Sequence, residues 1–445
     1  VYGANGNIVS VRKQGAGIAN VTDTINAGGY LVSFEGGQSK LELGDDKLKK
    51  GKYTLDAVLK DNGAKKYTVS VIVSAPQISA DGLVMTQYMK NLDCNVVYTV
   101  DGKSGNTVIS DGNKDTANRV KAVVELTDSA KEYLDLYQNG IYVEGFLVLT
   151  ADDETLSIPF LSFYGDWTKV PCFETEFLNG GKNVNSKFGL VAKSGNVEYE
   201  VGKNAYDEEA TADYAKCALS VNGNGMYVLT SVTLPLLRTV PSLGVYLLTE
   251  QDEVVCKYVY DSAASGTIGV SKIYYLDETG RKELTLNFSF DMRNCFYKDK
   301  NNFRQKVKAG QTLKFVVSAA LEYGEVEPSN CISFDIYIDG SAPEVKEESL
   351  KLSYIDGKRI LKTGVKDDHC LAAVKIYEAI GTHPDNIRVG SLLKTIAVTD
   401  FAKGQYNDLS FDVTDALKDY ANDYVVLYLE DYALNRTVCV VKAEG

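Results

Sequence analysis

The residues that could carry chemistry in this chain are few, and their spacing does not match the common catalytic and metal-binding motifs. Among its 445 residues are two histidines, His369 and His383, and eight cysteines. Both histidines stand in turn-like stretches, so we interpret each as a loop residue rather than a catalytic base or a metal ligand. The closest cysteines, Cys295 and Cys331, are 36 positions apart, which excludes a C-x-x-C zinc or redox motif. The sequence also lacks the H-E-x-x-H, G-x-S-x-G and P-loop strings.

Two acidic clusters could offer oxygen ligands to calcium. They are Asp152-Asp153-Glu154 and Asp367-Asp368. Neither follows the spacing of an EF-hand loop, and acidic hairpin tips are ordinarily solvated, which is the interpretation we favour for both. The sequence therefore assigns no catalytic, cofactor-binding or metal-binding residue, and it leaves calcium as the cation to test at these two places.

The composition is that of a folded chain rather than a disordered or membrane-spanning one. Hydrophobic residues make up 44% of it and charged residues 24%, close to the averages for soluble domains. No apolar run approaches the roughly 18 residues that a membrane-spanning helix needs. The net charge of −13 repels phosphate groups, so we expect neither nucleic acid nor an anionic membrane as a partner.

β-Strand signals dominate the sequence. Runs rich in β-branched and aromatic residues are bounded by turn residues, and the clearest are residues 67–73, 141–149, 312–317 and 424–429. Residues 142–150 and 155–160 flank an acidic turn and predict a hairpin. Many short strands at this spacing predict β-sandwiches rather than alternating β/α units. The 29 tyrosines fit this prediction, because tyrosine packs on a half-buried strand face and keeps its hydroxyl in water.

Few helices are expected, and breaks in the pattern suggest the domain boundaries. Ile18, Val21 and Ile25 fall on one face of a predicted helix over residues 18–27, and residues 128–138 predict a short helical turn. The length suits about three domains. With breaks near Gly28-Gly29, near Gly180-Gly181 and at residues 339–343, we expect an N-terminal piece followed by three sandwiches. The predicted ranges are 1–30, 31–176, 177–341 and 342–445.

The cysteines fit two chemical states. Several lie in strand-like apolar runs, as Cys256 and Cys439 do, where a free thiol packs as a small hydrophobic group. The three predicted sandwiches hold two, four and two cysteines, which also permits disulfides within each domain. The sequence cannot fix their connectivity.

Four strings of residues stand out in chain order. The first is Arg12-Lys13-Gln14-Gly15-Ala16-Gly17-Ile18, which leads into the predicted N-terminal helix, and the second is the hairpin that begins Tyr142-Val143-Glu144, with Gly165-Asp166-Trp167 after it. The third is Asn222-Gly223-Asn224-Gly225, and the fourth pairs Ser341-Ala342-Pro343 with Asp431-Tyr432-Ala433-Leu434-Asn435. In this order they resemble the back half of the large cell-envelope subtilisin-like serine proteases of Gram-positive bacteria, the family of the lactocepins and the complement-cleaving peptidases.

The resemblance implies an all-β fold of three consecutive fibronectin type III-like sandwiches, preceded by the tail of an absent α/β catalytic domain. Residues 1–30 would be that tail, with a short helix left over from the catalytic domain. The family's catalytic Asp, His and Ser stand upstream of its Q-G-A-G string, so no catalytic residue is carried over to this chain. The parent protein would be a serine endopeptidase, and these 445 residues would be inactive alone.

Two of the strings depart from the family's pattern. Val221 and Asn224 stand where the family has the Pro and Asp of P-N-G-D-G, and Leu434 replaces the Gly of D-x-A-G-N. The W-D-G string that is usual later in the second domain is missing as well. The resemblance therefore does not carry a calcium site into that domain.

The function implied by the resemblance is that of a non-catalytic stalk and scaffold. It would hold a secreted, cell-envelope-associated protease off the wall and support its substrate cleft, with the catalytic domain and protein or peptide substrates as partners. We expect a monomer. The alternative is an extracellular carbohydrate-binding or adhesive module, because tyrosine-rich sandwiches also bind glycans by stacking.

Overall fold

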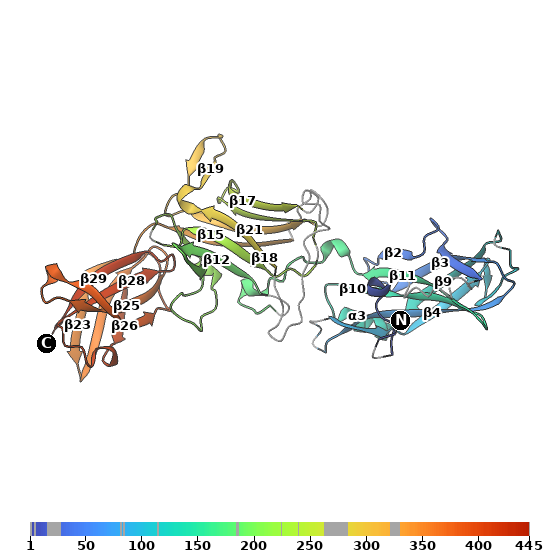
Figure 1. The fold of residues 1–445 in the computed structure, drawn as a ribbon, viewed down its shortest axis with the longest axis horizontal. Coiled ribbons are helices and arrows are strands. Elements are labelled where there is room, and N and C mark those ends of the chain that lie inside the picture. The colour runs from blue at the N-terminus through green and yellow to red at the C-terminus, as the bar shows by residue number, and fades with distance from the viewer. Residues whose placement is uncertain are drawn as a thin grey trace. The chain divides into compact units, whose positions relative to one another are not determined.

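The fold is all-β, as predicted (Figure 1). A computed structural model describes residues 2–3, 6–15, 28–80, 82, 85–113, 115–183, 187–223, 225–238, 240–261, 284–320 and 330–444. The chain forms two compact units, an N-terminal unit over Val1–Pro171 and a C-terminal unit over Cys172–Gly445.

The N-terminal unit is a β-sandwich. One sheet has the strand order β1-β3-β9-β6-β7, and the other has the order β2-β11-β10-β4-β5 with β8 beside β4. The strands are β1 Gly29–Ser33, β2 Leu41–Asp45, β3 Lys52–Asp61, β4 Lys66–Ile78, β5 Met85–Asn91, β6 Cys94–Val100, β7 Lys103–Ser104, β8 Thr107–Ile109, β9 Asn118–Leu126, β10 Ile141–Thr150 and β11 Thr155–Tyr164. Buried side chains of both sheets form one core, so the sheets pack face to face.

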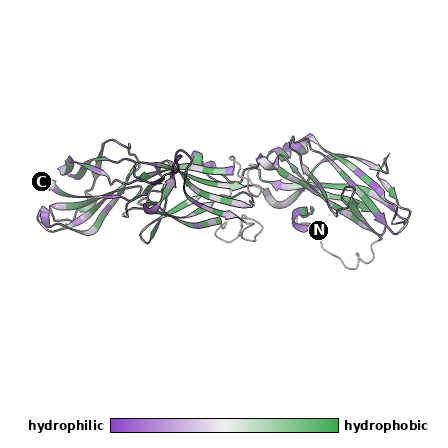
Figure 2. Cartoon of the chain, turned by 90° about the horizontal axis from the view of Figure 1, so that it is seen from above, coloured by the Kyte–Doolittle hydropathy of each residue, from purple (hydrophilic) through white to green (hydrophobic). Residues whose placement is uncertain are grey.

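Burial along these strands follows from their sequences. In β9, Val120, Ala122 and Val124 are fully buried and the residues between them are not, which is the period of two expected of a strand with one covered face. Figure 2 shows hydrophobic and hydrophilic residues alternating along the strands. The predicted hairpin is confirmed, because β10 and β11 pair in antiparallel register from Thr150 opposite Thr155.

The first part of the C-terminal unit is a second pair of facing sheets. Their strand orders are β13-β12-β15-β18 and β14-β22-β21-β16-β17, and a two-stranded ribbon, β19-β20, stands apart from both. The strands are β12 Gly189–Ser194, β13 Val197–Glu200, β14 Ala218–Ser220, β15 Val228–Leu234, β16 Ser242–Leu248, β17 Val254–Asp261, β18 Leu284–Asp291, β19 Phe296–Lys298, β20 Arg304–Lys306, β21 Thr312–Ala320 and β22 Cys331–Asp339. One hydrophobic core again draws on both sheets.

The rest of the C-terminal unit is a seven-stranded sheet of order β26-β25-β28-β29-β23-β24-β27. Its strands are β23 Glu344–Ile355, β24 Lys358–Lys366, β25 Leu371–Ile380, β26 Arg388–Ala397, β27 Asn407–Asp412, β28 Tyr424–Asp431 and β29 Arg436–Glu444. A short parallel pairing of Leu352 with Ala443 joins its two halves. Because Leu361 and Leu427, one from each half, share a core, the sheet folds over on itself.

Helices are short in the described residues. They are α1 Val11–Gln14, α3 Asp128–Asp135 and the 3-10 turns η1 Trp167–Lys169, η2 Glu176–Asn179, η3 Tyr214–Lys216, η4 Met292–Asn294, η6 Pro384–Asn386 and η7 Asp415–Leu417. The helical turn predicted over residues 128–138 is confirmed as α3, capped by the Thr127 hydroxyl, which accepts from Ala130 N at 3.3 Å. The helix predicted over residues 18–27 lies outside the described residues. Within the part of the chain that the structure covers, no helix has the length and apolar character to cross a membrane.

The sheets thus fall into three groups, over residues 29–164, 189–339 and 344–444. The domain boundaries at residues 31, 177 and 342 stay predictions.

The segment before the first strand is tied to the N-terminal sandwich by a buried charge. Glu144 in β10 is fully buried and accepts hydrogen bonds from Ser10 Oγ at 2.9 Å, Arg12 N at 3.2 Å and Arg12 Nη2 at 3.1 Å. The Arg12 guanidinium also lies 4.3 Å from the centre of the Tyr142 ring. A buried carboxylate needs a paired cation and satisfied lone pairs. Two of the strings singled out in the sequence therefore meet at one ion pair.

We predict that Arg12→Ala lowers the free energy of unfolding of the N-terminal unit by about 3 kcal/mol, because it leaves the Glu144 carboxylate buried without its cation. Chemical unfolding of the full chain measures this. Lys40→Ala is the control, since the Lys40–Glu42 pair is exposed on both sides, and its removal should change stability by less than about 0.5 kcal/mol. Equal effects of the two variants would contradict the prediction.

Candidate metal centre

Three buried aspartates, Asp339, Asp367 and Asp431, lie together in the C-terminal unit, and we refer to them as the aspartate cluster. Asp339 ends β22, Asp367 directly follows β24, and Asp431 ends β28. One carboxylate oxygen of each lies within 4.8 Å of the other two, and the residues are 1%, 3% and 0% exposed. Because β22 belongs to the sandwich and β24 and β28 to the seven-stranded sheet, the cluster lies where these two parts meet.

Backbone amides hold one oxygen of each carboxylate. Asp339 Oδ1 accepts from Ser341 N at 3.0 Å, and Asp367 Oδ1 accepts from His369 N at 2.9 Å. Asp431 is bound on both oxygens by Asn435, from N to Oδ1 and from Nδ2 to Oδ2, each at 2.8 Å. The Oδ2 atoms of Asp339 and Asp367 are buried and have no hydrogen-bond partner among the described residues. Two acceptors are thus left open inside the cluster.

The cluster carries like charges without a matching cation. Where the structure is described, no lysine or arginine forms an ion pair with any of the three aspartates. Burial, followed by the charge of Asp367, raises the pKa of Asp339 to about 7, and burial raises the pKa of Asp367 to about 6. Burial and the charges of the other two raise the pKa of Asp431 well above its ordinary value. Protons or a bound cation must therefore offset these charges.

Two loops fix the surroundings of the cluster. Met226 N donates to Ala433 O at 2.7 Å, and Ser220 Oγ donates to Asn435 Oδ1 at 2.8 Å. A Cβ atom on Gly225 would lie only 2.3 Å from Ala433 O, so the approach of the two backbones requires glycine there. The loop after β14 and the turn after β28 are thus packed backbone against backbone, and Asn435 connects this contact to Asp431.

The chemistry of the cluster favours a hard cation. Carboxylate oxygens are the ligands that Ca²⁺ and Mg²⁺ prefer, and Ca²⁺ accepts irregular sets of carboxylates, carbonyls and water. The unpartnered Oδ2 atoms of Asp339 and Asp367 fit such an ion, because a cation would bind the acceptor oxygens that the chain leaves without a hydrogen-bond donor. Asp431 would supply the third carboxylate.

The sequence pointed to one of these three residues. Asp367 belongs to the pair Asp367-Asp368, and its interpretation as a solvated acid is wrong, because Asp367 is buried between β24 and β25. Asp368 is exposed and accepts from Ser341 Oγ at 2.9 Å. Sequence reasoning missed Asp339, taken as part of a domain-boundary turn, and Asp431, seen only as part of a motif. Each is an acid that ends a largely buried strand, which is a signal that could have found them.

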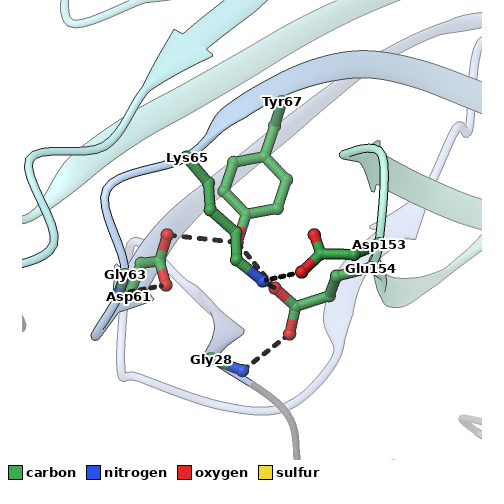
Figure 3. Close-up of polar contacts among 7 residues, drawn as sticks. All are labelled: Gly28, Asp61, Gly63, Lys65, Tyr67, Asp153 and Glu154. Carbon is green, nitrogen blue, oxygen red and sulfur yellow. Dashed lines mark hydrogen bonds and ion pairs between the residues drawn. The ribbon is translucent and has the colours of Figure 1, made fainter.

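In the other acidic cluster, Asp152-Asp153-Glu154, the Lys65 side chain binds two of the carboxylates (Figure 3). Glu154 accepts from Lys65 Nζ at 3.0 Å, Tyr67 Oη at 2.8 Å and Gly28 N at 2.8 Å, and Asp153 accepts from the same Lys65 at 3.2 Å. Hydrogen bonds from Lys65 and Tyr67 hold the pKa of the Glu154 carboxyl below its ordinary value, against the effect of burial. The prediction of a solvated hairpin tip is therefore wrong for Glu154, which anchors residue 28 to the β10–β11 turn.

The two histidines lie in loops, as predicted. His369 is buried, stacks on Tyr337 with ring centres 5.0 Å apart, and has its pKa lowered by burial. His383 is exposed and lies 3.4 Å from Asp385. Trp167 packs edge-on against Phe163, with ring centres 5.0 Å apart, and is half-buried.

Comparison with known proteins shows what this chain is similar to. The chain is 25% identical over 388 residues to the PI-type proteinase of Lactococcus lactis subsp. cremoris, a match that covers 82% of this chain and 19% of the proteinase. It is 26% identical over 378 residues to the PII-type proteinase of Lacticaseibacillus paracasei, with the same two coverages. The chain is similar to cell-envelope proteinases. The predicted resemblance is confirmed, and the chain spans about a fifth of the length of these relatives.

No protein-family model matches the sequence. Among solved structures, the BSP domain of a biofilm-associated protein is 10% identical, with 88% of this chain and 63% of that chain covered and a TM-score of 0.24. A TM-score this low supports no conclusion about a shared fold.

We predict that Asp339→Asn stabilises the metal-free protein at pH 8, stabilises it less at pH 5, and leaves it unchanged only below about pH 3. An unfolded aspartate ionises near its ordinary pKa of 3.8, whereas folded Asp339 ionises near 7. Between these values the folded state binds more protons, so stability falls as pH rises through this window, and the amide avoids that loss. The gain at pH 8 should be on the order of 4 kcal/mol. Thermal unfolding in EDTA measures it, and an Asp339→Asn variant that is no more stable than wild type at pH 8 would contradict it.

Proposed function

We propose that this chain is a non-catalytic β-sandwich region of a secreted subtilisin-like serine endopeptidase of the bacterial cell envelope. The observation that carries the proposal is the similarity to cell-envelope proteinases over 82% of the chain. The family's string around the catalytic serine does not occur in the 445 residues. The chemistry would therefore belong to a catalytic domain elsewhere in the parent protein, and this region would support it.

The proposal includes the domain organisation. Residues 1–30 are the tail of the catalytic domain, and residues 31–176, 177–341 and 342–445 are three fibronectin type III-like domains. Facing sheets with separate cores over residues 29–164, 189–339 and 344–444 support this division. Its partners are the catalytic domain and protein or peptide substrates, and its place is outside the cell.

The proposed mechanical role is supported by how the last two parts of the chain are joined. Asn204 Nδ2 donates to Ala372 O at 2.9 Å, and Tyr206 Oη donates to Glu430, which is fully buried in β28. With the aspartate cluster and the loop contact at Gly225, these bonds cross from the sandwich to the seven-stranded sheet at several points. Such a joint resists bending, as a stalk or scaffold requires.

We further propose that the aspartate cluster binds calcium and that the ion locks this joint. The observation that favours it is the pair of buried, unpartnered oxygens on Asp339 and Asp367. A cation that binds the folded state alone stabilises it in proportion to the logarithm of its concentration over the dissociation constant. Calcium would thereby couple the folding of the second sandwich to that of the seven-stranded sheet.

Calcium at about a hundred times its dissociation constant is expected to raise the Tm of the full chain by about 5–10 °C. Asp431→Asn should abolish most of this rise, because it removes one of three charged ligands. Asp385→Asn is the matched control: Asp385 is exposed and away from the cluster, so the calcium effect should persist. Thermal unfolding with calcium or magnesium measures the shifts. A calcium effect of equal size in Asp431→Asn and wild type would overturn the site.

The scaffold role predicts that deletion of residues 31–445 from the parent protease changes its cleavage of protein substrates. The rate of cleavage of a short chromogenic peptide should stay within about threefold of the rate of the intact enzyme. Such a peptide makes few contacts with the cleft, so its cleavage depends less on the support of the cleft. That peptide also controls for loss of folding in the catalytic domain. Mass spectrometry of the cleavage products measures specificity, and an unchanged set of cleavage sites would contradict the proposal.

The carbohydrate-binding alternative has less support in the described residues. Trp167 packs against Tyr142 and Phe163 and is half-buried, whereas a sugar-stacking site usually uses an exposed tryptophan. An open groove of ≈ 390 Å³ lies by β1, β2 and β3, but polar side chains such as Glu35, Lys40 and Asp56 line it and no aromatic ring does. Binding to a glycan array would favour this alternative.

A further inference from the structure

Two cysteines outside the aspartate cluster lie in unusually close contact. Cys256 is the third residue of β17, and Cys295 follows η4 and precedes β19. Their Sγ atoms are 2.8 Å apart. Non-bonded heavy atoms pack at about 3.5–4.0 Å, so these sulfurs are closer than packing alone brings two side chains.

Each of the two cysteines lies in or shortly after the edge strand of one of two facing sheets. β17 is the outer strand of the sheet β14-β22-β21-β16-β17, and β18, which leads to Cys295, is the outer strand of the facing sheet β13-β12-β15-β18. Cys295 is anchored, because its carbonyl accepts from Val307 N at 3.1 Å and its side chain is 6% exposed. Cys256 is held in β17 by its pairing with Leu247. A link between them would join the open edges of the two sheets.

We propose that Cys256 and Cys295 form an intrachain disulfide that staples β17 to the segment following β18. This rests on the proposed function for its compartment, because disulfides persist outside the cell and not in a reducing cytosol. The bond closes a loop of 39 positions, which removes conformational freedom from the unfolded chain. The staple therefore stabilises the sandwich that carries Asp339.

The contact also suits the chemistry of formation. Either thiol can donate in this contact, and when Cys256 donates, the hydrogen bond lowers the pKa of the Cys295 thiol and favours its thiolate. That thiolate attacks a disulfide such as oxidised glutathione, displaces one thiol and forms a mixed disulfide. The Cys256 thiolate then attacks the Cys295 sulfur and displaces the second thiol. The two cysteines lose two electrons and two protons in all, and one glutathione disulfide is reduced to two thiols.

The test is to refold the full chain with reduced and oxidised glutathione, block free thiols with iodoacetamide without reduction, and map the proteolytic peptides by mass. The expected product is a peptide pair that joins Cys256 to Cys295 and separates on reduction. Alkylation of both cysteines in the oxidised, folded chain would overturn the staple, whatever the location of the parent protein. This readout uses the wild-type chain and does not depend on the folding of any variant.

Thermal unfolding gives a second readout. Oxidation should raise the Tm of the wild-type chain by about 5–10 °C over the reduced chain. The Cys256→Ser/Cys295→Ser double variant should lose this difference, and Cys94→Ser, which alters a half-buried thiol of the N-terminal unit, should keep it. The bond should also be present in chain recovered from the medium of a secreting host, and free thiols there would overturn it as a native feature. A failure of the scaffold role would appear instead in the cleavage specificity of the parent protease and would leave the peptide map unchanged.

Discussion

The constraint on which this structure depends is that a carboxylate taken out of water must find a compensating charge. The chain meets it with its own cations in several places: Glu144 is paired with Arg12, Glu154 with Lys65, and Glu430 with Lys375 at 2.9 Å and Arg436. The pairs with Arg12, Lys65 and Lys375 tie segments that are distant in sequence, because the compensating cation of each comes from another element. The aspartate cluster is equally buried but draws on no side-chain cation in the described residues, and this difference singles it out.

The contrast between paired and unpaired acids is sharpest where the second sandwich meets the seven-stranded sheet. Glu430 and Asp431 are consecutive residues of β28, and both are fully buried. Hydrogen bonds from Tyr206 and Lys375 hold the pKa of Glu430 below its ordinary value against burial, whereas Asp431 faces the two other acids and has its pKa raised. Successive residues of a strand point to opposite sides. One side of β28 is therefore compensated by the protein itself, and the other requires protons or an ion.

The sequence predicts local structure here far better than it predicts the site. The β10–β11 hairpin and α3 follow from signals contained in a few neighbouring residues, namely turn chemistry, strand alternation and the Thr127 cap. The aspartate cluster does not, because its members lie at or just after the ends of three strands from two different sheet systems, and only the packing of these strands brings the carboxylates together. The contact of Cys256 with Cys295 is of the same kind: the sequence allows disulfides but carries no information on which strand edges meet.

Leu434 offsets the backbone strain of its position by burying its side chain. It stands where the related D-x-A-G-N string has glycine, and its φ of 65° lies in the left-handed region, which costs a non-glycine residue roughly 1–2 kcal/mol. Its side chain is 8% exposed and belongs to the core of the sandwich formed by β12 to β22, although Leu434 itself lies in the turn after β28. Burial of a leucine side chain contributes about 1.5–3 kcal/mol, which offsets the backbone strain. The turn that holds Asp431 is thus anchored in the neighbouring core by a side chain that glycine could not provide.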